Sequence, residues 1–265
     1  MKNLKIGIIQ TDLFWEKADE NRQMLNPKIA KLACEGAQLI IMPEMVNSGF
    51  SMDTKKIAES PKGKTQQWMQ AKSQKHDVTL IASLCVEENG KYFNRLLICA
   101  PNKKTEHYDK RHLFAFGEED KYYTAGNKQK ILSLYDWNIS FGICYDLRFP
   151  VWLKNSYQDN SYGYDVLVLV ANWPEKRNYQ WEQLLIARAI ENQAFVVGVN
   201  RIGTDGREIY YCGNSLVINP IGEIIYRGAK GKEDIALVEL EKERLIHYRE
   251  RMNCGKDWDD FQINY

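Results

Sequence analysis

Short runs of consecutive apolar residues alternate along the chain with longer stretches in which apolar residues recur at helical spacing. Runs that are apolar on successive residues predict strands buried on both faces, whereas spacings of three and four predict helices. The first half begins with a predicted strand, KIGIIQ, and a helix that carries Leu25, Ile29, Leu32 and Ala33 and ends at Gly36. A second strand, QLIIMP, and a helix around Trp68 follow. The half closes with a hairpin, in which EENGK joins the strands VTLIASLCV and YFNRLLICA.

The second half repeats this order, so the two halves look like structural echoes. Its predicted elements are the strand ISFGICYD, the short helix FPVWLKN, the strand DVLVLVAN, the helix NYQWEQLLIARAIENQ and the strand AFVVGVN, which leads to a hairpin with the turn NPIGE. The later runs SLVINP and IALVELE alternate more, which predicts a sheet with one covered face.

Two such sheets packed on each other, with helices outside, give an α/β fold of four layers, an α/β/β/α sandwich. No linker rich in proline or serine and no low-complexity tract divides the chain. Residues 1–265 are therefore predicted to form a single domain.

Composition and charge narrow the class of protein without changing this fold. The 36 Lys and Arg residues nearly balance the 35 Asp and Glu residues and are interspersed with them, so we expect no nucleic-acid partner. A small or weakly charged substrate fits better. The apolar run in MKNLKIGIIQTD is too short for a signal peptide, and no stretch approaches the roughly 20 apolar residues of a membrane span. We expect a cytoplasmic protein.

The cysteines and histidines give no support for a metal site. Six cysteines are scattered without CxxC pairs, and the four histidines show no HxH or HExxH spacing. Most of these cysteines lie in or beside apolar segments, where the usual role is that of a small buried side chain. Cys144 differs, because it closes a buried strand where the chain turns toward Pro150. We expect backbone N–H groups at this strand-to-helix turn to lower the pKa of its thiol.

Two further charged residues also lie where predicted strands end, the place where α/β folds concentrate reactive side chains. Glu44 follows the strand IIMP, and Lys110 follows the hairpin strand among apolar and aromatic residues. Taken singly, each is more often a solvated charge. Together with Cys144 they supply the base, the oxyanion donor and the nucleophile that acyl transfer needs. Because Glu44 and Cys144 end equivalent predicted strands of the two halves, we expect them to meet across one crevice.

Three segments in this order resemble the Glu-Lys-Cys triad motifs of the nitrilase (carbon-nitrogen hydrolase) superfamily: IIMPEM, DKRHLF and GICYDLRFP. The resemblance extends over nearly the whole chain, through ANWP and RAIENQAFVVGVNRIG to the hairpin NPIGEII and the tail ending in DF. Within the superfamily the chain looks most like the omega-amidase branch. That branch hydrolyses the terminal amide of short 2-oxo acid amides such as 2-oxoglutaramate and 2-oxosuccinamate.

The resemblance implies a role for each triad residue. Glu44 would deprotonate Cys144, and the thiolate would attack the amide carbonyl while Lys110 and the backbone N–H of Tyr145 hold the oxyanion. A thioester would form, ammonia would leave, and water activated by the same glutamate would release the acid. No cofactor is implied, and the family resemblance suggests a homodimer or larger assembly.

A second active-site glutamate is also implied by the resemblance, and FGEEDKYY offers Glu118 and Glu119. We prefer Glu119 because of its spacing along the sequence from the AGN segment that follows it. Asn172 and Trp173 end a strand on the same side as Cys144 and are predicted to line the substrate pocket, although core packing is an equal alternative.

Recognition of a substrate carboxylate calls for a cation or backbone donors. Arg148 and Arg201 are the candidates, and either could instead form a structural ion pair. Arg188 and Glu191 lie three residues apart on one helix and are interpreted as a structural pair rather than as catalytic residues.

Other functions remain open at this point. A Cys-His hydrolase would use Cys144 equally well, but neither His112 nor His247 falls in a recognised Cys-His motif. An aliphatic nitrilase, a carbamoylase or an amide-forming acyltransferase would use the same triad. A non-catalytic scaffold of this fold would be expected to lose triad members, and all three are present.

Overall fold

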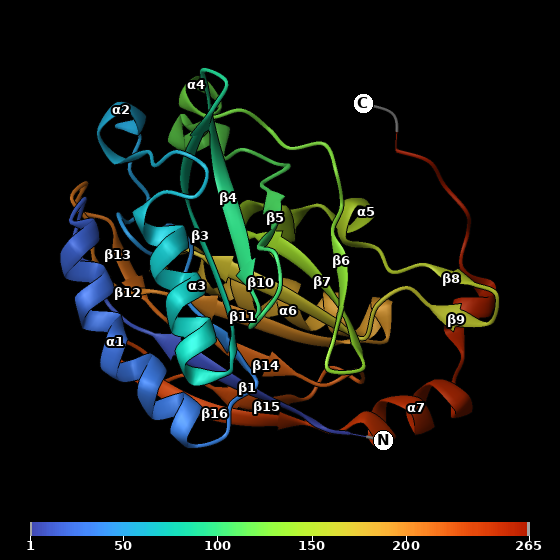
Figure 1. The fold of residues 1–265 in the computed structure, drawn as a ribbon. Coiled ribbons are helices and arrows are strands. Elements are labelled where there is room, and N and C mark those ends of the chain that lie inside the picture. Colours follow the sequence, from blue (N-terminus) through green and yellow to red (C-terminus); the bar gives the residue numbers. More distant parts are fainter. Residues whose placement is uncertain (1, 264–265) are drawn as a thin grey trace.

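The computed structural model describes residues 2–263 and consists of two six-stranded sheets packed face to face, with helices on their outer faces (Figure 1). The first sheet has the order β16-β1-β2-β3-β4-β5. Its strands are β1 (Leu4–Gln10), β2 (Leu39–Ile41), β3 (Thr79–Glu88), β4 (Lys91–Cys99), β5 (Glu106–Asp109) and β16 (Asp234–Leu240).

The second sheet has the order β15-β14-β11-β10-β7-β6. Its strands are β6 (Ile131–Leu134), β7 (Trp137–Ile143), β10 (Val166–Ala171), β11 (Phe195–Asn200), β14 (Leu216–Ile218) and β15 (Ile224–Arg227). Two small hairpins lie outside the sheets: β8 (Tyr157–Gln158) with β9 (Ser161–Tyr162), and β12 (Ile202–Thr204) with β13 (Tyr210–Cys212).

Helices complete the four layers. The α-helices are α1 (Ala18–Cys34), α2 (Thr54–Ile57), α3 (Lys64–His76), α4 (Glu119–Tyr122), α5 (Pro150–Leu153), α6 (Asn178–Asn192) and α7 (Lys242–Arg251). The short 3-10 helices are η1 (Ala115–Gly117), η2 (Cys144–Arg148), η3 (Glu175–Arg177) and η4 (Cys254–Asp257). Figure 1 shows α1 and α3 side by side on one sheet, while α6 packs on β11 and β14 of the other.

The core follows the predicted burial pattern. One apolar cluster joins the facing sides of both sheets, with Ile6 and Ile41 from the first sheet and Ile139 and Val168 from the second. A separate cluster fills the space between the first sheet and helices α1 and α3. The predicted α/β/β/α sandwich is therefore confirmed, together with the order of strands and helices in each half.

Two expectations about strands are wrong. The strand predicted over ISFGICYD ends at Ile143, and Cys144 already begins η2. The runs SLVINP and IALVELE were expected to have one covered face. In β14 all three side chains are buried, because α6 covers the outer side, and in β16 Leu237 packs toward α1 while Leu240 faces the other sheet.

The two halves do echo each other, but not in the way that was expected for the site. In each half three parallel strands are followed by an antiparallel one: β1-β2-β3-β4 and β7-β10-β11-β14. The end of β2, which leads to Glu44, therefore corresponds to the end of β10 and Asn172, not to Cys144 at the end of β7. The expectation that Glu44 and Cys144 end equivalent strands is wrong.

Candidate active site

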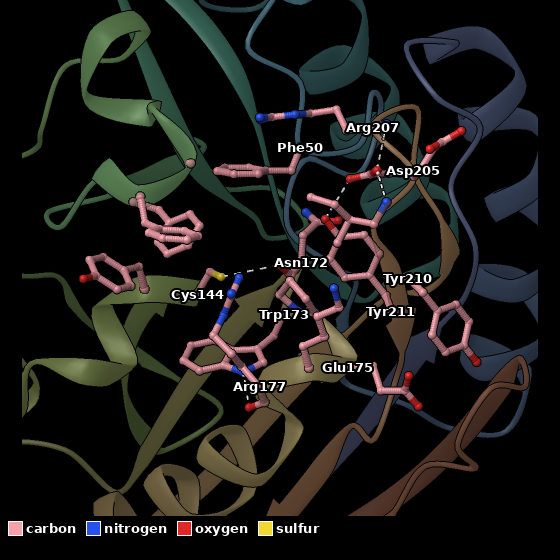
Figure 2. A pocket seen from close by; sticks show the side chains of 18 of the residues that line it. Phe50, Cys144, Asn172, Trp173, Glu175, Arg177, Asp205, Arg207, Tyr210 and Tyr211 are labelled. Atoms are coloured by element: carbon pink, nitrogen blue, oxygen red, sulfur yellow. Dashed lines mark hydrogen bonds between the residues drawn. The ribbon is translucent and has the colours of Figure 1, made fainter.

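A cavity of about 500 Å³ opens at the carboxyl ends of the parallel strands β7 and β10, and Cys144 lies in its wall. Figure 2 shows Cys144 together with Trp173 and, further away, Tyr211 from the β12–β13 hairpin, all in the wall of this cavity. Phe50 closes a further side. The lining combines aromatic and charged side chains, which suits a small organic molecule that carries a polar or charged group.

Cys144 is held in a sharp turn between β7 and η2. Its φ is +45°, a left-handed conformation that residues other than glycine rarely adopt. Asp146 fixes this turn from behind, because its carboxylate accepts hydrogen bonds from the backbone N–H of Ile143 (3.0 Å) and His112 (2.9 Å) and from the hydroxyl of Tyr108 (2.7 Å). These bonds stabilise a strained backbone at the position of the candidate nucleophile.

The thiol of Cys144 donates to the backbone oxygen of Asn172, with Sγ and O 3.8 Å apart (Figure 2). Burial raises the pKa of Cys144 well above its ordinary value, and the charge of Glu44 raises it further, while Lys110 acts in the opposite direction. The expectation of a lowered pKa is wrong, because η2 is a single short turn whose N–H groups are outweighed by desolvation and by nearby carboxylates. The thiol therefore needs a base.

Glu44, Lys110 and Glu119 meet beside Cys144 although they come from separate segments. The Nζ atom of Lys110 lies 3.0 Å from Oε1 of Glu44 and 2.8 Å from Oε2 of Glu119, and all three side chains have 0% exposure. Burial alone would lower the pKa of Lys110, but the charges of Glu119 and Glu44 raise it above its ordinary value. Lys110 is therefore a fixed cation between two carboxylates.

Of the two neighbouring glutamates, Glu119 lies in the site and Glu118 lies outside it. Glu119 begins α4, and its Oε2 accepts the backbone N–H of Phe114 at 2.6 Å. Glu118 is exposed and pairs with Lys121 at 2.6 Å. Burial raises the pKa of Glu119; the charge of Lys110 opposes this rise and that of Glu44 adds to it.

Asn172 connects Glu44 to Cys144. Its backbone N–H donates to Oε2 of Glu44 at 2.7 Å, and its side-chain Nδ2 donates to the backbone oxygen of Glu44 at 2.7 Å. Because its own backbone oxygen accepts the thiol of Cys144, Asn172 bridges the ends of β2, β7 and β10. It also lines the cavity, as do Tyr145 and Trp173.

Asn94, in β4, was missed by sequence reasoning. Its Nδ2 donates to Oε1 of Glu44 at 2.8 Å and to Oε1 of Glu119 at 3.2 Å. The signal in the sequence is a single asparagine inside the buried run YFNRLLICA, since a buried polar side chain in a strand needs a partner.

The two candidate arginines have different surroundings. Arg148 lines the cavity with its guanidinium 5.0 Å from the ring centre of Trp173, and no carboxylate among residues 2–263 pairs with it. Arg201 has 0% exposure, and its Nη2 lies 2.5 Å from Oδ1 of Asp12. It packs behind Tyr211 outside the cavity lining, which argues against substrate binding by Arg201.

Two more arginines line the cavity and were not predicted. Arg177 lies with its guanidinium 5.2 Å from the ring centre of Phe114, and Arg207 lies on the loop between β12 and β13 (Figure 2). Arg177 follows closely on the motif ANWP, which could have drawn attention to it, whereas Arg207 carries no sequence signal that we recognise.

Neither His112 nor His247 lines the cavity, and the predicted pair Arg188 and Glu191 does not line it either. His112 bonds to Asp146 and stacks on Phe149. Arg188 forms the predicted pair with Glu191, with Nη1 and Oε1 3.0 Å apart. Among residues 2–263 no group of His, Cys, Asp or Glu is arranged to hold a metal ion, and no helix there has the length and apolar character of a membrane span.

The conserved-domain model described as carbon-nitrogen hydrolase matches residues 5–250. The chain belongs to the carbon-nitrogen hydrolase family. This confirms the family that the Glu, Lys and Cys motifs indicated.

Full-length relatives place this carbon-nitrogen hydrolase in the omega-amidase-like branch. The omega-amidase YafV of Escherichia coli (strain K12) is 37% identical over 263 residues, which cover 99% of this chain and 100% of that protein. The 2-oxoglutaramate amidase of Bacillus subtilis (strain 168) is 31% identical over 255 residues, which cover 95% of this chain and 96% of that protein.

A solved structure agrees with the fold throughout. XC1258 of Xanthomonas campestris, described as a CN-hydrolase superfamily protein with an arsenic adduct in the active site, has a TM-score of 0.97 and 34% identity, with 100% of both chains covered. The carbon-nitrogen hydrolase therefore has the sandwich of its family without a large insertion relative to XC1258.

Proposed function

We propose that this carbon-nitrogen hydrolase is an omega-amidase, which hydrolyses the terminal amide of short 2-oxo acid amides such as 2-oxoglutaramate and 2-oxosuccinamate to the acid and ammonia. The observation that carries the proposal is the position of Lys110, whose Nζ lies between the buried carboxylates of Glu44 and Glu119 beside the cavity thiol of Cys144. The full-length relatives named omega-amidase and 2-oxoglutaramate amidase support the substrate class.

In the first half-reaction Glu44 is the base and Cys144 the nucleophile. Because burial raises the pKa of Cys144, the thiol gives up its proton only as its sulfur attacks the amide carbonyl, and Glu44 accepts that proton. The new C–S bond makes a tetrahedral oxyanion. Lys110 Nζ and the backbone N–H of Tyr145 stabilise this oxyanion.

Collapse of the tetrahedral adduct breaks the C–N bond. Glu44 returns its proton to the departing nitrogen, so ammonia leaves and a thioester on Cys144 remains. Water then loses a proton to Glu44 and attacks the thioester, and the departing thiolate recovers that proton. Glu119 holds Lys110 through both of its oxygens. No step requires a cofactor.

Arg148 is the proposed site for the substrate carboxylate. It lies four residues after the nucleophile, it lines the cavity, and its guanidinium has no carboxylate partner in the described part of the chain. A guanidinium and a carboxylate form two parallel charge-assisted hydrogen bonds, which fixes the end of the substrate remote from the amide. Trp173, beneath Arg148, would pack on the short carbon chain.

The remaining proposals concern the setting of the enzyme. We propose a cytoplasmic enzyme formed by residues 1–265 as a single domain, and a homodimer or larger homo-oligomer without nucleic-acid or membrane partners. The near balance of 36 basic and 35 acidic residues supports the absence of a nucleic-acid partner.

Ammonia release by the purified protein tests the proposed function. The substrates are 2-oxoglutaramate and 2-oxosuccinamate, beside glutamine, asparagine, an aliphatic nitrile and an N-carbamoyl amino acid. We expect preference for the two oxo-acid amides and loss of turnover in Cys144→Ala. Activity confined to another compound would retain the triad and replace the substrate, and turnover by a folded Cys144→Ala variant would exclude the mechanism.

A further inference from the structure

Among residues 2–263, Asn94 is the one neutral side chain that hydrogen-bonds to both buried carboxylates of the site. Its Nδ2 lies 2.8 Å from Oε1 of Glu44 and 3.2 Å from Oε1 of Glu119, and its backbone oxygen accepts the N–H of Lys110 at 2.9 Å. Asn94 is 1% exposed and sits in β4, paired with Cys85 of β3. One residue therefore contacts every charged member of the site.

The orientation of the Asn94 amide is set by these contacts. Its Oδ1 is buried and accepts no hydrogen bond from any residue between 2 and 263. The reverse orientation would place this oxygen against the oxygens of Glu44 and Glu119 and leave the NH₂ group without an acceptor. A buried amide with one unused end is unfavourable for stability, so its retention points to the NH₂ group as the useful part.

The electrostatics of the site show what this NH₂ group supplies. Two carboxylates share one cation, Lys110, in a place without solvent exposure. Each carboxylate disfavours ionisation of the other, and hydrogen bonds to the ionised form have the opposite effect. Asn94 gives one such bond to each carboxylate without adding a charge.

We propose that Asn94 is a positioning residue that keeps Glu44 ionised and aligned for proton transfer from Cys144 by bonding Glu44 and Glu119 at once. The inference rests on the proposed function in one respect, since it takes Glu44 as the base of an amidase. Nothing in it depends on which amide is the substrate.

Three substitutions separate the donor from the shape of the side chain. Asn94→Asp keeps the shape and replaces the donor with an acceptor, and Asn94→Leu removes both polar ends. Asn94→Ser replaces the carboxamide with a smaller hydroxyl, so it cannot overpack the strand if the other variants fail to fold. This hydroxyl can donate to only one of Glu44 and Glu119 at a time. Thermal unfolding and circular dichroism establish that each protein is folded.

Alkylation of Cys144 by iodoacetamide, followed by mass spectrometry across pH, reads the state of Glu44 without any substrate. Loss of the Asn94 bond removes support for ionised Glu44, so we expect the acid side of the profile to move up by about one pH unit in Asn94→Leu. We expect a larger move in Asn94→Asp and a smaller one in Asn94→Ser. The exposed Cys34 provides an internal reference that should not move.

Steady-state kinetics give the second readout. We expect kcat on the preferred amide to fall by about tenfold or more in Asn94→Leu, with KM changed much less, because the bond acts on proton transfer and not on substrate binding. The matched control is Asn192→Ala, which removes another asparagine with 0% exposure, on α6. It should lower thermal stability and leave the alkylation profile and kcat unchanged.

The outcomes of the two proposals are separable. A shifted alkylation profile without activity on oxo-acid amides would support the role of Asn94 and contradict the proposed substrate. Turnover of oxo-acid amides with unshifted profiles and unchanged kcat in a folded Asn94→Leu or Asn94→Ser protein would overturn the role of Asn94 and leave the proposed function intact.

Discussion

Two buried ionic clusters of this protein have opposite composition. In the site, one cation, Lys110, lies between two carboxylates. At the amino end of β10, one carboxylate, Asp165, lies between two cations, Lys242 and Arg249, which fasten α7 to the sandwich. The two clusters have similar contacts at similar distances, so distance alone does not distinguish a catalytic cluster from a structural one.

The difference lies in what surrounds each cluster. At Arg249 the guanidinium also donates to the backbone oxygens of Gln193 (2.9 Å) and Tyr164 (2.8 Å), so its donors are used. Around the site, Oδ1 of Asn94 and Oδ1 of Asn172 are buried without a donor in the described chain. A buried polar atom without a partner lowers stability, so these two asparagines need another reason to be at the site.

Removing the carboxylate charge at each cluster gives the largest expected contrast. Glu44→Gln should lower turnover by about 10³-fold or more with the fold retained, because an amide cannot accept the thiol proton. Asp165→Asn, the matched change in the other cluster, should leave kcat within a few-fold and lower the melting temperature instead. Ammonia release and thermal unfolding measure the pair, and near-normal turnover in Glu44→Gln would contradict the assignment of the base.

Removing a cation from the structural cluster tests the same contrast in stability. Arg249→Ala leaves Asp165 with one cation and frees two backbone oxygens, so we expect a loss of about 3 kcal/mol in the free energy of unfolding. Denaturant titration measures this loss. The activity of the folded fraction should be unchanged, and a variant that is equally stable but inactive would place α7 in the function of the site.

The strands, the helices and their order could be predicted because burial on one or two faces produces a characteristic spacing of apolar residues. The mistakes come from long-range packing. The alternation in SLVINP suggested an open face, but α6 covers it, and no local pattern records which helix will pack on a given strand. The expected equivalence of Glu44 and Cys144 was wrong because the order of strands in a sheet, not their order along the chain, decides which loops meet.

The site residues that stand in a sequence motif could be predicted. A residue whose proposed role is to position another side chain could not. Cys144, Lys110 and Glu44 stand in recognisable segments. Asn94 has no motif, and its role follows only from two carboxylates that lie 50 and 25 residues away in the chain. Arg201 looked equal to Arg148 because its partner, Asp12, is 189 residues distant.

Arg148 and Arg201 also differ in their partners. Arg148 lines the cavity and has no carboxylate partner among residues 2–263, whereas Arg201 is buried and pairs with Asp12. Arg148→Ala should raise KM for 2-oxo acid amides by about tenfold to hundredfold, the usual effect of losing a charge-assisted hydrogen bond. A neutral amide such as butyramide provides the control, since its KM should not change. Equal effects on both substrates would assign Arg148 to packing on Trp173 and would move carboxylate binding to Arg177 or Arg207.

The smallest effect concerns the neighbours Glu118 and Glu119, which are expected to respond to pH with opposite sign. Burial raises the pKa of Glu119 above its ordinary 4.5, so the folded protein holds this proton after the unfolded chain has lost it. The stability of the wild type relative to Glu119→Gln should therefore fall as pH rises from about 4.5 toward the raised pKa.

Glu118 is the matched control for that measurement. Its hydrogen bond with Lys121 lowers its pKa from 4.5, so its contribution is present above the unfolded pKa and is lost as pH falls through the lowered value. Because Glu118 is exposed, solvent screening should keep this contribution small. Denaturant titrations of wild type, Glu119→Gln and Glu118→Gln between pH 4 and 8 measure both slopes. A relative stability that rises with pH for Glu119 would mean that the charge of Lys110 outweighs burial at this residue.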